Sequence, residues 1–506
     1  MLKQKELLVL GATGYIGSRL VPKLLEKGYI VRVGFRSKNK LNSRLWSHHR
    51  NLKAVNLNVF DINTLEDAMD EVSTVFYLIH SMEGKIKDFI ESDRIAAQNT
   101  IIAAENAAIE RIIYLGGLGD EKEKLSKHLQ SRIEVSRILD SCSIPVTTLR
   151  AAIIIGSGSA AFEMMRYLVD RLPIMITPKW LRTKNQPIAI KNVLKYLTDC
   201  LDVPETIGEA FDIGGSDIIT YKQFMESYIE IMRLPRRLIF PIPFFTPSLS
   251  SYWIRLITGI PSSLARPLID GMKNEVICQD FRIRELIPQE LLNHKQAIRL
   301  ALNPQQYLMH GSYSNYADLP VEWHIPGDPP WSGGLVFQDH RRAILSGSAD
   351  DLWNKLLQIQ QYGNLRIISY FWKFGAFLDS FFRGFKVKID INEIPLAMQN
   401  KIPKRELTLH TDLIIPGYTM LRYRLRRIND KKIELHQIFR IVPKGLIGIS
   451  YWFAFQPLFD RISKQLIDEI CMNINRDSPK FEKVNSTSKP YYLSSTKRFL
   501  TEGFLE

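Results

Sequence analysis

Short apolar runs alternate with amphipathic helical patterns over the first 150 residues. The runs are rich in β-branched residues and are bounded by polar or glycine positions, which is typical of strands buried inside a parallel sheet. The predicted strands are residues 7–10, 31–34, 55–59, 75–79, 111–115 and 147–155, with helices such as residues 16–27 and 92–108 between them. Regular alternation of strands and helices predicts an α/β fold with a doubly wound parallel sheet.

The pattern changes twice beyond residue 150. A short strand at residues 210–215 precedes residues 216–317, which are mainly helical and rich in proline and aromatic residues, as expected of a cap over an apolar cleft. Residues 318–335 then hold a cluster of prolines and glycines, which predicts a linker. The sequence therefore predicts an α/β domain with a helical cap over residues 1–317, followed by a second domain.

The C-terminal part shows strand-like alternation followed by one long helix. Strands are predicted at residues 340–346, 406–415, 418–427 and 432–442, with helices starting near residue 348 and spanning residues 446–474. A curved antiparallel sheet crossed by a long helix is a helix-grip-like α+β architecture, whose interior is usually an apolar cavity. We expect such a domain over residues 336–476 and a polar tail over residues 477–506.

Composition restricts the class of protein and its partners. Of 506 residues, 45% are hydrophobic and 24% are charged, which is average for a folded chain and excludes a disordered or fibrous protein. The formal net charge is +14, and most of the excess follows residue 335. There, Arg422, Arg424 and Arg426 alternate with apolar residues. Basic and aromatic residues fall on opposite faces of that strand, so we expect a solvated face and no nucleic-acid partner.

The cellular location follows from weaker signals. The four cysteines are widely spaced, which favours a reducing compartment, and the chain begins without a signal-peptide pattern. No apolar run reaches the roughly 20 residues that a spanning helix needs. We therefore expect a cytoplasmic protein. The basic charge and the uncharged runs at residues 238–254 and 445–459 leave peripheral contact with the inner face of the membrane as an open alternative.

A glycine-rich loop joins the first predicted strand to the first predicted helix. In Gly11-Ala-Thr-Gly-Tyr-Ile-Gly17, the first glycine allows the tight turn, the second lets a pyrophosphate approach, and the third lets the helix pack on the strand. The helix N-terminus adds free N–H groups and a positive dipole end. This context predicts dinucleotide binding by Gly11, Thr13, Gly14, Tyr15, Ile16 and Gly17.

The end of the second predicted strand indicates which dinucleotide is bound. An NAD site usually has an acidic residue there, which accepts a hydrogen bond from the ribose 2′-hydroxyl. This chain has Arg36 and Ser37 instead, and no acidic residue is nearby. An arginine and a serine suit a 2′-phosphate, so NADP is favoured over NAD as the cofactor.

These motifs together resemble those of the atypical short-chain dehydrogenase/reductases that have an epimerase-like Rossmann domain. The similar segments are the glycine loop, Phe35-Arg36-Ser37 and residues 77–82, 111–119 and 128–134. The resemblance implies that Asn58 and Val59 lie beside the adenine, and that Ile79 and His80 line the adenosine and nicotinamide ribose. Residues 249–272 and 443–452 are similar to a bacterial subgroup in which this domain is fused to a C-terminal domain of unknown function, here with a START/polyketide-cyclase-like pattern.

Catalytically active members of this family carry Ser or Thr after the fifth strand and Tyr-x-x-x-Lys on the next helix. Here glycines fall at the serine position, and His128 and Arg132 fall on the helix at the same four-residue spacing. His128 can serve as a proton donor with Arg132 holding the ribose, although an adjacent arginine lowers the pKa of an imidazole. Alternatively, both residues bind the cofactor without catalysing a reaction. The scattered histidines and cysteines show no metal-ligand spacing.

Three functions remain open on the sequence alone. The first is an NADP-dependent oxidoreductase that acts on a small apolar carbonyl or enoyl substrate, with the hydride supplied by the cofactor. The second is a non-catalytic NADP-binding redox sensor or scaffold, which the missing serine and tyrosine favour. The third is a carrier that holds a hydrophobic ligand in the C-terminal cavity.

Overall fold

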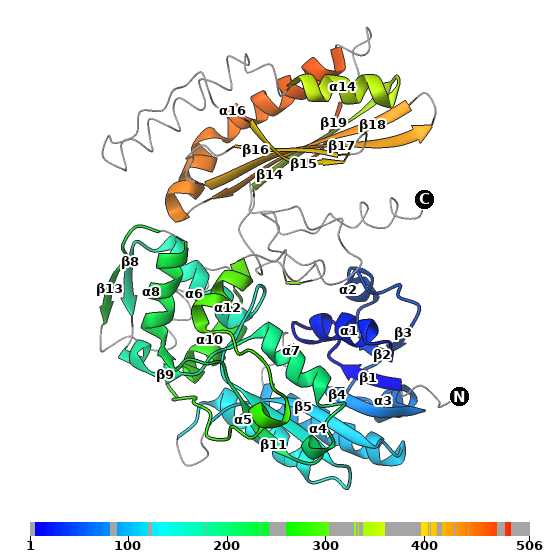
Figure 1. Ribbon diagram of the computed structural model, residues 1–506, viewed down its shortest axis with the longest axis vertical. Helices are drawn as coiled ribbons and strands as arrows, with labels where there is room; N and C mark the ends of the chain where they lie inside the picture. The colour runs from blue at the N-terminus through cyan, green and yellow to red at the C-terminus, as the bar shows by residue number, and fades with distance from the viewer. Residues whose placement is uncertain are drawn as a thin grey trace. The chain divides into compact units, whose positions relative to one another are not determined.

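The computed structural model describes two units of the chain (Figure 1). The described residues are 6–80, 89–119, 124–177, 179–232, 234–241, 260–302, 328–329, 332, 337–359, 396–402, 404, 406–411, 417–429, 432–443, 445–472 and 481–486. The first unit comprises the described residues up to Leu302 together with Asp328, Pro329 and Ser332, and the second runs from Phe337 to Ser486.

A seven-stranded parallel sheet forms the centre of the first unit. Its strands are β1 (Glu6–Leu10), β2 (Ile30–Phe35), β3 (Leu52–Asn56), β4 (Val72–Tyr77), β5 (Arg111–Gly117), β6 (Val146–Ala151) and β11 (Ala210–Ile213). The order is β11-β6-β5-β4-β1-β2-β3, and all neighbouring pairs are parallel. The order reverses between β1 and β4, so their carboxyl ends flank the crevice where doubly wound folds bind ligands.

Helices cover both faces of this sheet and bury two apolar cores. They are α1 (Gly17–Glu26), α2 (Lys38–Asn42), α3 (Ile62–Met69), α4 (Phe89–Asn106), α5 (Lys127–Asp140) and α7 (Ile190–Asp199). Helices α1 and α7 share a core on one face, through side chains such as Leu24 and Val193. Helices α3, α4 and α5 share the core of the other face, through side chains such as Leu65, Ala97 and Val135. The doubly wound α/β fold expected from the sequence is confirmed.

The turn between β1 and α1 is so tight that two of its positions require glycine. Gly11 has a φ of +81°, and a Cβ there would lie 2.7 Å from the carbonyl oxygen of Leu78. A Cβ at Gly17 would lie 2.4 Å from the carbonyl oxygen of Gly11. Both neighbours are backbone atoms, which cannot move away without opening the turn. The glycines therefore hold the first turn of α1 directly beside the ends of β1 and β4.

A helical cap adjoins the sheet of the first unit. Its helices are α6 (Ala160–Arg171), α8 (Tyr221–Ile231), α10 (Ser262–Gly271), α11 (Ile283–Leu286) and α12 (His294–Leu302). Short strand pairs accompany them: β7 (Ile154–Ile155) with β10 (Ile188–Ala189), β8 (Ile174–Thr177) with β13 (Leu238–Pro241), and β9 (Lys184–Asn185) with β12 (Ile219–Thr220). Helices α6, α8, α10 and α12 share one apolar core. The cap thus includes α6, although the sequence pattern placed its start near residue 216.

The second unit is an antiparallel sheet with two helices against one face (Figure 1). In sheet order, its strands are β15 (Leu396–Ile402), β16 (Glu406–Thr411), β17 (Gly417–Asn429), β18 (Lys432–Pro443), β14 (Phe337–Ser346) and β19 (Phe481–Ser486). Trp353 of α14 (Ala349–Ile359) and Ile467 of α16 (Gly445–Met472) join Leu435 in one apolar core on this face. The expected strands and helices occur here as far as the structure describes them, residues 412–415 lying outside the described part, and the helix-grip-like architecture with its ligand cavity stays a prediction.

Two expectations for the C-terminal part differ from the structure. Residues 477–506 are polar enough to predict a tail, but β19 lies within them and pairs with β14. Arg422 was expected on a solvated face, yet it is only 1% exposed and its Nε lies 3.3 Å from Oε1 of Glu406. Glu406 also binds Arg424, with 2.6 Å between Nε and Oε2. The neighbouring strand thus supplies the counter-charge that lets an arginine be buried.

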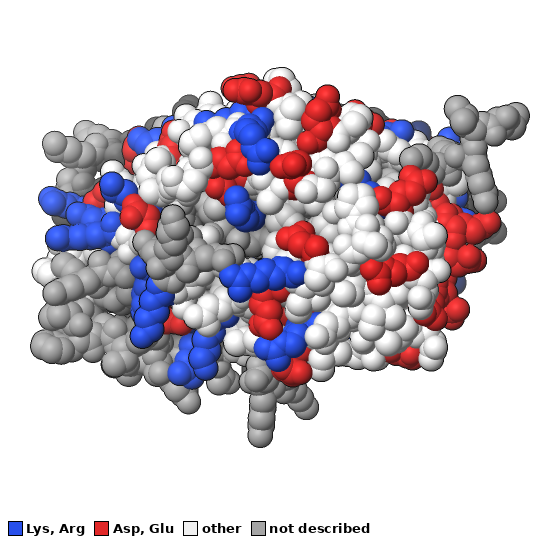
Figure 2. Space-filling view, turned by 90° about the horizontal axis from the view of Figure 1, so that it is seen from below, with Lys and Arg blue, Asp and Glu red and all other residues white. Residues whose placement is uncertain are grey.

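Helix hydropathy and the distribution of charge bear on the expectations for a membrane surface and for nucleic acid. Among the described helices, none has both the length and the apolar character needed to cross a membrane. Figure 2 shows one face of the molecule, on which acidic side chains occur beside the basic ones, so that this face carries no continuous basic patch.

Replacing Gly17 with alanine should destabilise the protein by about 1–3 kcal/mol, because the new Cβ meets the Gly11 carbonyl. The free energy of unfolding from urea titration measures this effect. Gly271→Ala is the control, since a Cβ there makes only ordinary contacts of 3.6 Å or more, to side-chain atoms of Ser126 and His128. Equal stability of the two variants would contradict the steric argument.

Candidate functional site

A pocket of about 450 Å³ lies at the carboxyl ends of β1 and β4, between the sheet and the cap. Its lining comes from the glycine-rich loop, the segments after β2, β4, β5 and β6, and the helices α5 and α10. The residues expected to bind a cofactor or to catalyse that line it are Gly11, Thr13, Gly14, Tyr15, Ile16, Arg36, Val59, Ile79, His80, His128 and Arg132. The pocket therefore unites residues from most of the predicted motifs.

The glycine-rich loop offers hydrogen-bond donors to this pocket. Gly14 N–H closes the turn on Gly11 O at 2.9 Å, and Ser18 N–H donates to Gly14 O at 3.0 Å. Among the described residues, no backbone oxygen accepts from the N–H groups of Tyr15 and Ile16, which begin the first turn of α1. Unsatisfied N–H groups at a helix N-terminus bind phosphate well. The loop thus fits the pyrophosphate of a dinucleotide.

Basic side chains line the pocket where β2 ends. Arg36 follows β2, and Lys40 lies one turn along α2. Ser37, expected to contact a 2′-phosphate, instead caps α2 by accepting a hydrogen bond from Lys40 N–H, and it lies outside the lining. Asn58 also lies outside it, because its side-chain oxygen accepts from Phe60 N–H at 3.3 Å. The described lining contains no carboxylate.

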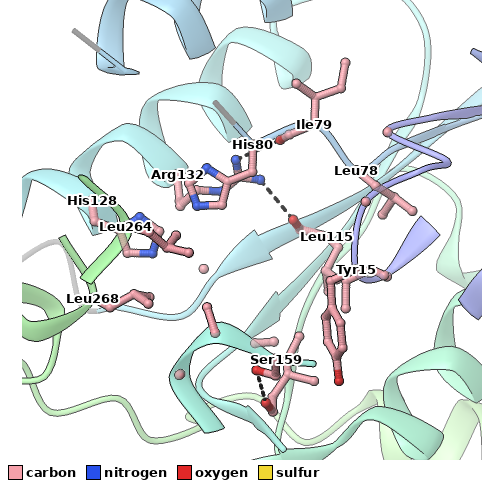
Figure 3. A pocket seen from close by; sticks show the side chains of 18 of the residues that line it. Tyr15, Leu78, Ile79, His80, Leu115, His128, Arg132, Ser159, Leu264 and Leu268 are labelled. Carbon is pink, nitrogen blue, oxygen red and sulfur yellow. Dashed lines mark hydrogen bonds between the residues drawn. The ribbon is translucent and has the colours of Figure 1, made fainter. Parts of the chain in front are cut away.

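Arg132 ties together the ends of two central strands. Its guanidinium donates to Ile79 O at 3.1 Å and to Leu115 O at 3.0 Å, as Figure 3 shows. Nη1 also lies 3.9 Å from a carboxylate oxygen of Asp93, which is buried and accepts from Ser131 Oγ at 3.1 Å. Arg132 therefore has a fixed position where the nicotinamide ribose of a Rossmann-bound cofactor is expected.

His128 lies one helical turn before Arg132 and stacks on His80. The two imidazole rings are 5.0 Å apart and inclined by only 11°, and Figure 3 shows them beside Arg132. Burial, His80 and Arg132 hold the pKa of His128 well below its usual value. Its Nδ1 is buried and has no hydrogen-bond partner among the described residues. His128 is therefore neutral near pH 7, and it can donate a hydrogen bond but cannot act as an imidazolium acid.

The far end of the pocket is apolar. Side chains from α10 and the segment after it form this wall: Leu264, Leu268, Met272 and Val276. Figure 3 shows Leu264 and Leu268 next to His128. Gly116 and Gly117 line the pocket in place of the family's serine or threonine, so that no hydroxyl reaches in from the end of β5. An apolar substrate fits beside a neutral hydrogen-bond donor at this end.

Several lining residues were not identified from the sequence. Lys40 and Arg44 follow Arg36 at intervals of four residues, a periodic signal that points to one side of a helix. The α10 residues carried only a composition signal, because the cap is brought to the site by tertiary contacts. Gly17 does not line the pocket, since its role is the close packing of the turn.

Ser227, His294 and Asp217 form a hydrogen-bonded series outside this pocket. Ser227 Oγ lies 2.9 Å from His294 Nε2, and His294 Nδ1 lies 2.6 Å from Asp217 Oδ2. The same carboxylate oxygen accepts from His294 N–H at 3.0 Å, at the start of α12. Ser227 is buried within α8. The arrangement therefore fastens α8 to α12 and caps α12.

Residues 11–146 match the model of a family described as NAD(P)H-binding. One curated relative is the mitochondrial "NADH dehydrogenase [ubiquinone] 1 alpha subcomplex subunit 9" of Arabidopsis thaliana, 22% identical over 56% of this chain and 74% of the relative. Another is the chloroplastic divinyl chlorophyllide a 8-vinyl-reductase of Cucumis sativus, 22% identical over 42% of this chain. The chain spans 53% of the length of that reductase.

Solved structures also resemble the first unit. An NADPH-dependent quinone oxidoreductase from Escherichia coli, in complex with NADPH, aligns over 58% of this chain and 98% of its own, with a TM-score of 0.47 and 14% identity. A nucleoside-diphosphate-sugar epimerase from Staphylococcus aureus aligns over 58% and 99%, with a TM-score of 0.48 and 15% identity.

The fold, the loop and the family match define an NAD(P)-binding Rossmann domain. The matched residues 11–146 run from the glycine-rich loop to the first residue of β6.

Replacing His128 with glutamine should make the free energy of unfolding depend less on pH below about pH 7.5. Because the pKa of His128 is lowered in the folded protein, the unfolded chain binds a proton more readily, and stability is lost as the pH falls below about 6.5. His128→Gln should therefore lose less unfolding free energy than the wild type between about pH 7.5 and about pH 5. His48→Gln, at an exposed loop position, is the control and should keep the wild-type slope. An unchanged slope in His128→Gln would show that His128 titrates normally.

Proposed function

We propose that the protein is an NADP(H)-dependent reductase of a small apolar carbonyl or enoyl compound. The observation that carries the proposal is the continuity of one pocket. It runs from two basic side chains, past the free N–H groups of the glycine-rich loop, to the apolar wall formed by α10. A long cofactor with several negative phosphate charges and an apolar acceptor each match one part of this lining.

The basic end favours NADP over NAD. Arg36 and Lys40 can pair with a 2′-phosphate, and the described lining has no carboxylate to accept from a ribose 2′-hydroxyl. A bound reduced nicotinamide supplies a hydride, which leaves with both electrons of its C–H bond. Arg132 holds the ribose, and the α10 side chains exclude water from the acceptor.

His128 suits an acceptor that needs no acid to start the reaction. As the hydride reaches carbon, negative charge develops on the acceptor oxygen, and a neutral imidazole N–H stabilises that charge by a hydrogen bond. Because the pKa of His128 is lowered by burial, His80 and Arg132, proton delivery from an imidazolium is disfavoured. Conjugated acceptors, whose product anion is delocalised and can take its proton from water after it leaves the pocket, fit this chemistry best.

A cofactor sensor without turnover is the second candidate. The glycines at the usual serine position and the lowered pKa of His128 both favour it, since they remove acid catalysis from the site. A sensor binds NADPH and NADP⁺ with different affinities and consumes neither.

Arg36→Ala should weaken NADPH binding by about tenfold or more and change NADH binding less than about twofold, because only NADPH carries the 2′-phosphate. Fluorescence titration of the purified protein with NADPH, NADP⁺, NADH and NAD⁺ measures this preference. Lys38→Ala is the matched control, since Lys38 is a basic residue two positions after Arg36, at the start of α2, and lies outside the pocket lining. Absence of dinucleotide binding by the wild type would refute the proposed function.

His128→Ala should reduce kcat by about 10–100-fold and leave the Kd for NADPH nearly unchanged. NADPH oxidation is followed with a quinone, an α,β-unsaturated ketone and an unconjugated ketone as probes, and the first two should react faster. His48→Ala is the control. Unchanged turnover in His128→Ala would remove His128 from the mechanism, and tight NADPH binding without oxidation by any probe would favour the sensor.

A further inference from the structure

A carboxylate from far along the chain lies against the glycine-rich loop. Asp328 belongs to the segment expected to be a linker, but its side chain is only 2% exposed. Its Oδ2 accepts from Arg19 Nη2 at 2.7 Å, and its Oδ1 accepts from Arg44 Nη1 at 2.8 Å. Burial alone would raise the pKa of Asp328, but the two guanidinium groups hold it below its usual value, so the carboxylate is ionised.

Each arginine in turn binds a carbonyl of the loop. Arg44 donates through Nη2 to Thr13 O, and Arg19 donates through Nη1 to Tyr15 O at 2.8 Å. Arg19 also donates to Ser157 O at 2.7 Å and lies 4.1 Å from the centre of the Tyr15 ring. The carboxylate of Asp328 therefore positions two guanidinium groups, each of which donates a hydrogen bond to a different carbonyl of the glycine-rich loop.

The orientation of a carbonyl determines where the next N–H points. In a trans peptide the C=O and the following N–H point in opposite directions. Holding Tyr15 O toward Arg19 directs the N–H of Ile16 the other way, and holding Thr13 O directs the N–H of Gly14 toward Gly11 O, which it reaches at 2.9 Å. Arg19 thus sets the direction of the Ile16 N–H, which remains for a pyrophosphate, and Arg44 keeps the Gly14 N–H in the turn.

The arrangement separates the carboxylate from the pocket. Arg44 and Pro329 line the pocket, whereas Asp328 and Arg19 do not. Arg44 therefore contacts the pocket and Asp328 at the same time. Side-chain exposures of 2% for both Asp328 and Arg44 mean that water screens this ion pair little.

We propose that Asp328 is a positioning residue of the dinucleotide site: through Arg19 and Arg44 it holds the glycine-rich loop in the form that binds pyrophosphate. This inference rests on the proposed binding of a dinucleotide. It assigns part of the cofactor site to a residue that follows the Rossmann domain and its cap in sequence. In sequence, the second unit resumes at Gly334, soon after Asp328.

The test compares Asp328→Asn with Glu6→Gln in the full chain. Glu6 is also a buried carboxylate between two cations, at 2.6 Å from both Arg32 and Lys53, but it lies at the start of β1 and outside the pocket lining. Calorimetric titration with NADPH and with NADH should show both affinities about tenfold weaker in Asp328→Asn and unchanged in Glu6→Gln. Asp328→Glu should recover part of the affinity, which loss of fold stability alone does not predict.

The outcomes are distinct. Equal binding of NADPH by a folded Asp328→Asn overturns the inference, because the carboxylate would then contribute nothing to binding. Tighter binding overturns it as well, because the carboxylate would then repel the pyrophosphate. A loss confined to NADPH also overturns it, because the effect would then lie at the 2′-phosphate, as for Arg36→Ala. If the wild type binds neither dinucleotide, the proposed function itself fails.

A second measurement applies if Asp328→Asn does not fold. If the ion pairs of Asp328 with Arg19 and Arg44 favour dinucleotide binding, then by thermodynamic linkage a bound dinucleotide must favour those ion pairs equally. Saturating NADPH should therefore slow hydrogen exchange of the wild-type peptide that contains residues 328–332, and leave the peptide that contains Glu6 unchanged. Equal exchange of the first peptide with and without NADPH overturns the inference.

Discussion

The close approach of α1 to the ends of β1 and β4 is the constraint on which the rest of the first unit depends. The turn has no room for a Cβ at Gly11 or Gly17, because backbone carbonyls occupy the space. This closeness brings the free N–H groups of Tyr15 and Ile16 to the point where the strand order reverses. A looser turn would move the donors away from the crevice and would leave the sheet without its binding edge.

The lining of the pocket changes from basic at one end to apolar at the other. At one end the lining carries the basic side chains of Arg36, Lys40 and Arg44, and at the other it is an apolar wall. Between them, Arg132 binds strand carbonyls while His128 and His80 stack without forming a proton-donating pair. These contacts suit the proposed reductase, in which the site would orient the reactants and stabilise charge more than it would supply a proton.

The sequence predicted well those parts of the structure that depend on residue spacing within one segment. Alternating strands and helices, the glycine-rich loop, and the pair formed by His128 and Arg132 were all visible in the sequence, because spacing alone sets them. Composition indicated a cap over an apolar cleft, but the particular residues of the apolar wall and Asp328 were not visible, since they reach the pocket through contacts between distant segments. Ser37 and Asn58 show the opposite error: their residue types suit a ligand, but in the structure both side chains accept hydrogen bonds from nearby backbone N–H groups.

Because of the ion pairs of Asp328, the boundary of the first unit differs between secondary structure and ion pairing. Judged by secondary structure, the first unit ends with α12, and the proline-rich segment after it would be the natural place to divide the chain. Judged by charge, the unit ends only after residue 328, because Arg19 and Arg44 are buried and lack this carboxylate in any shorter chain. A fragment cut after the last helix would lose the carboxylate that pairs with these two buried guanidinium groups beside the glycine-rich loop. The nucleotide-binding half of this protein therefore needs the first residues of the connection to its second half in order to be complete.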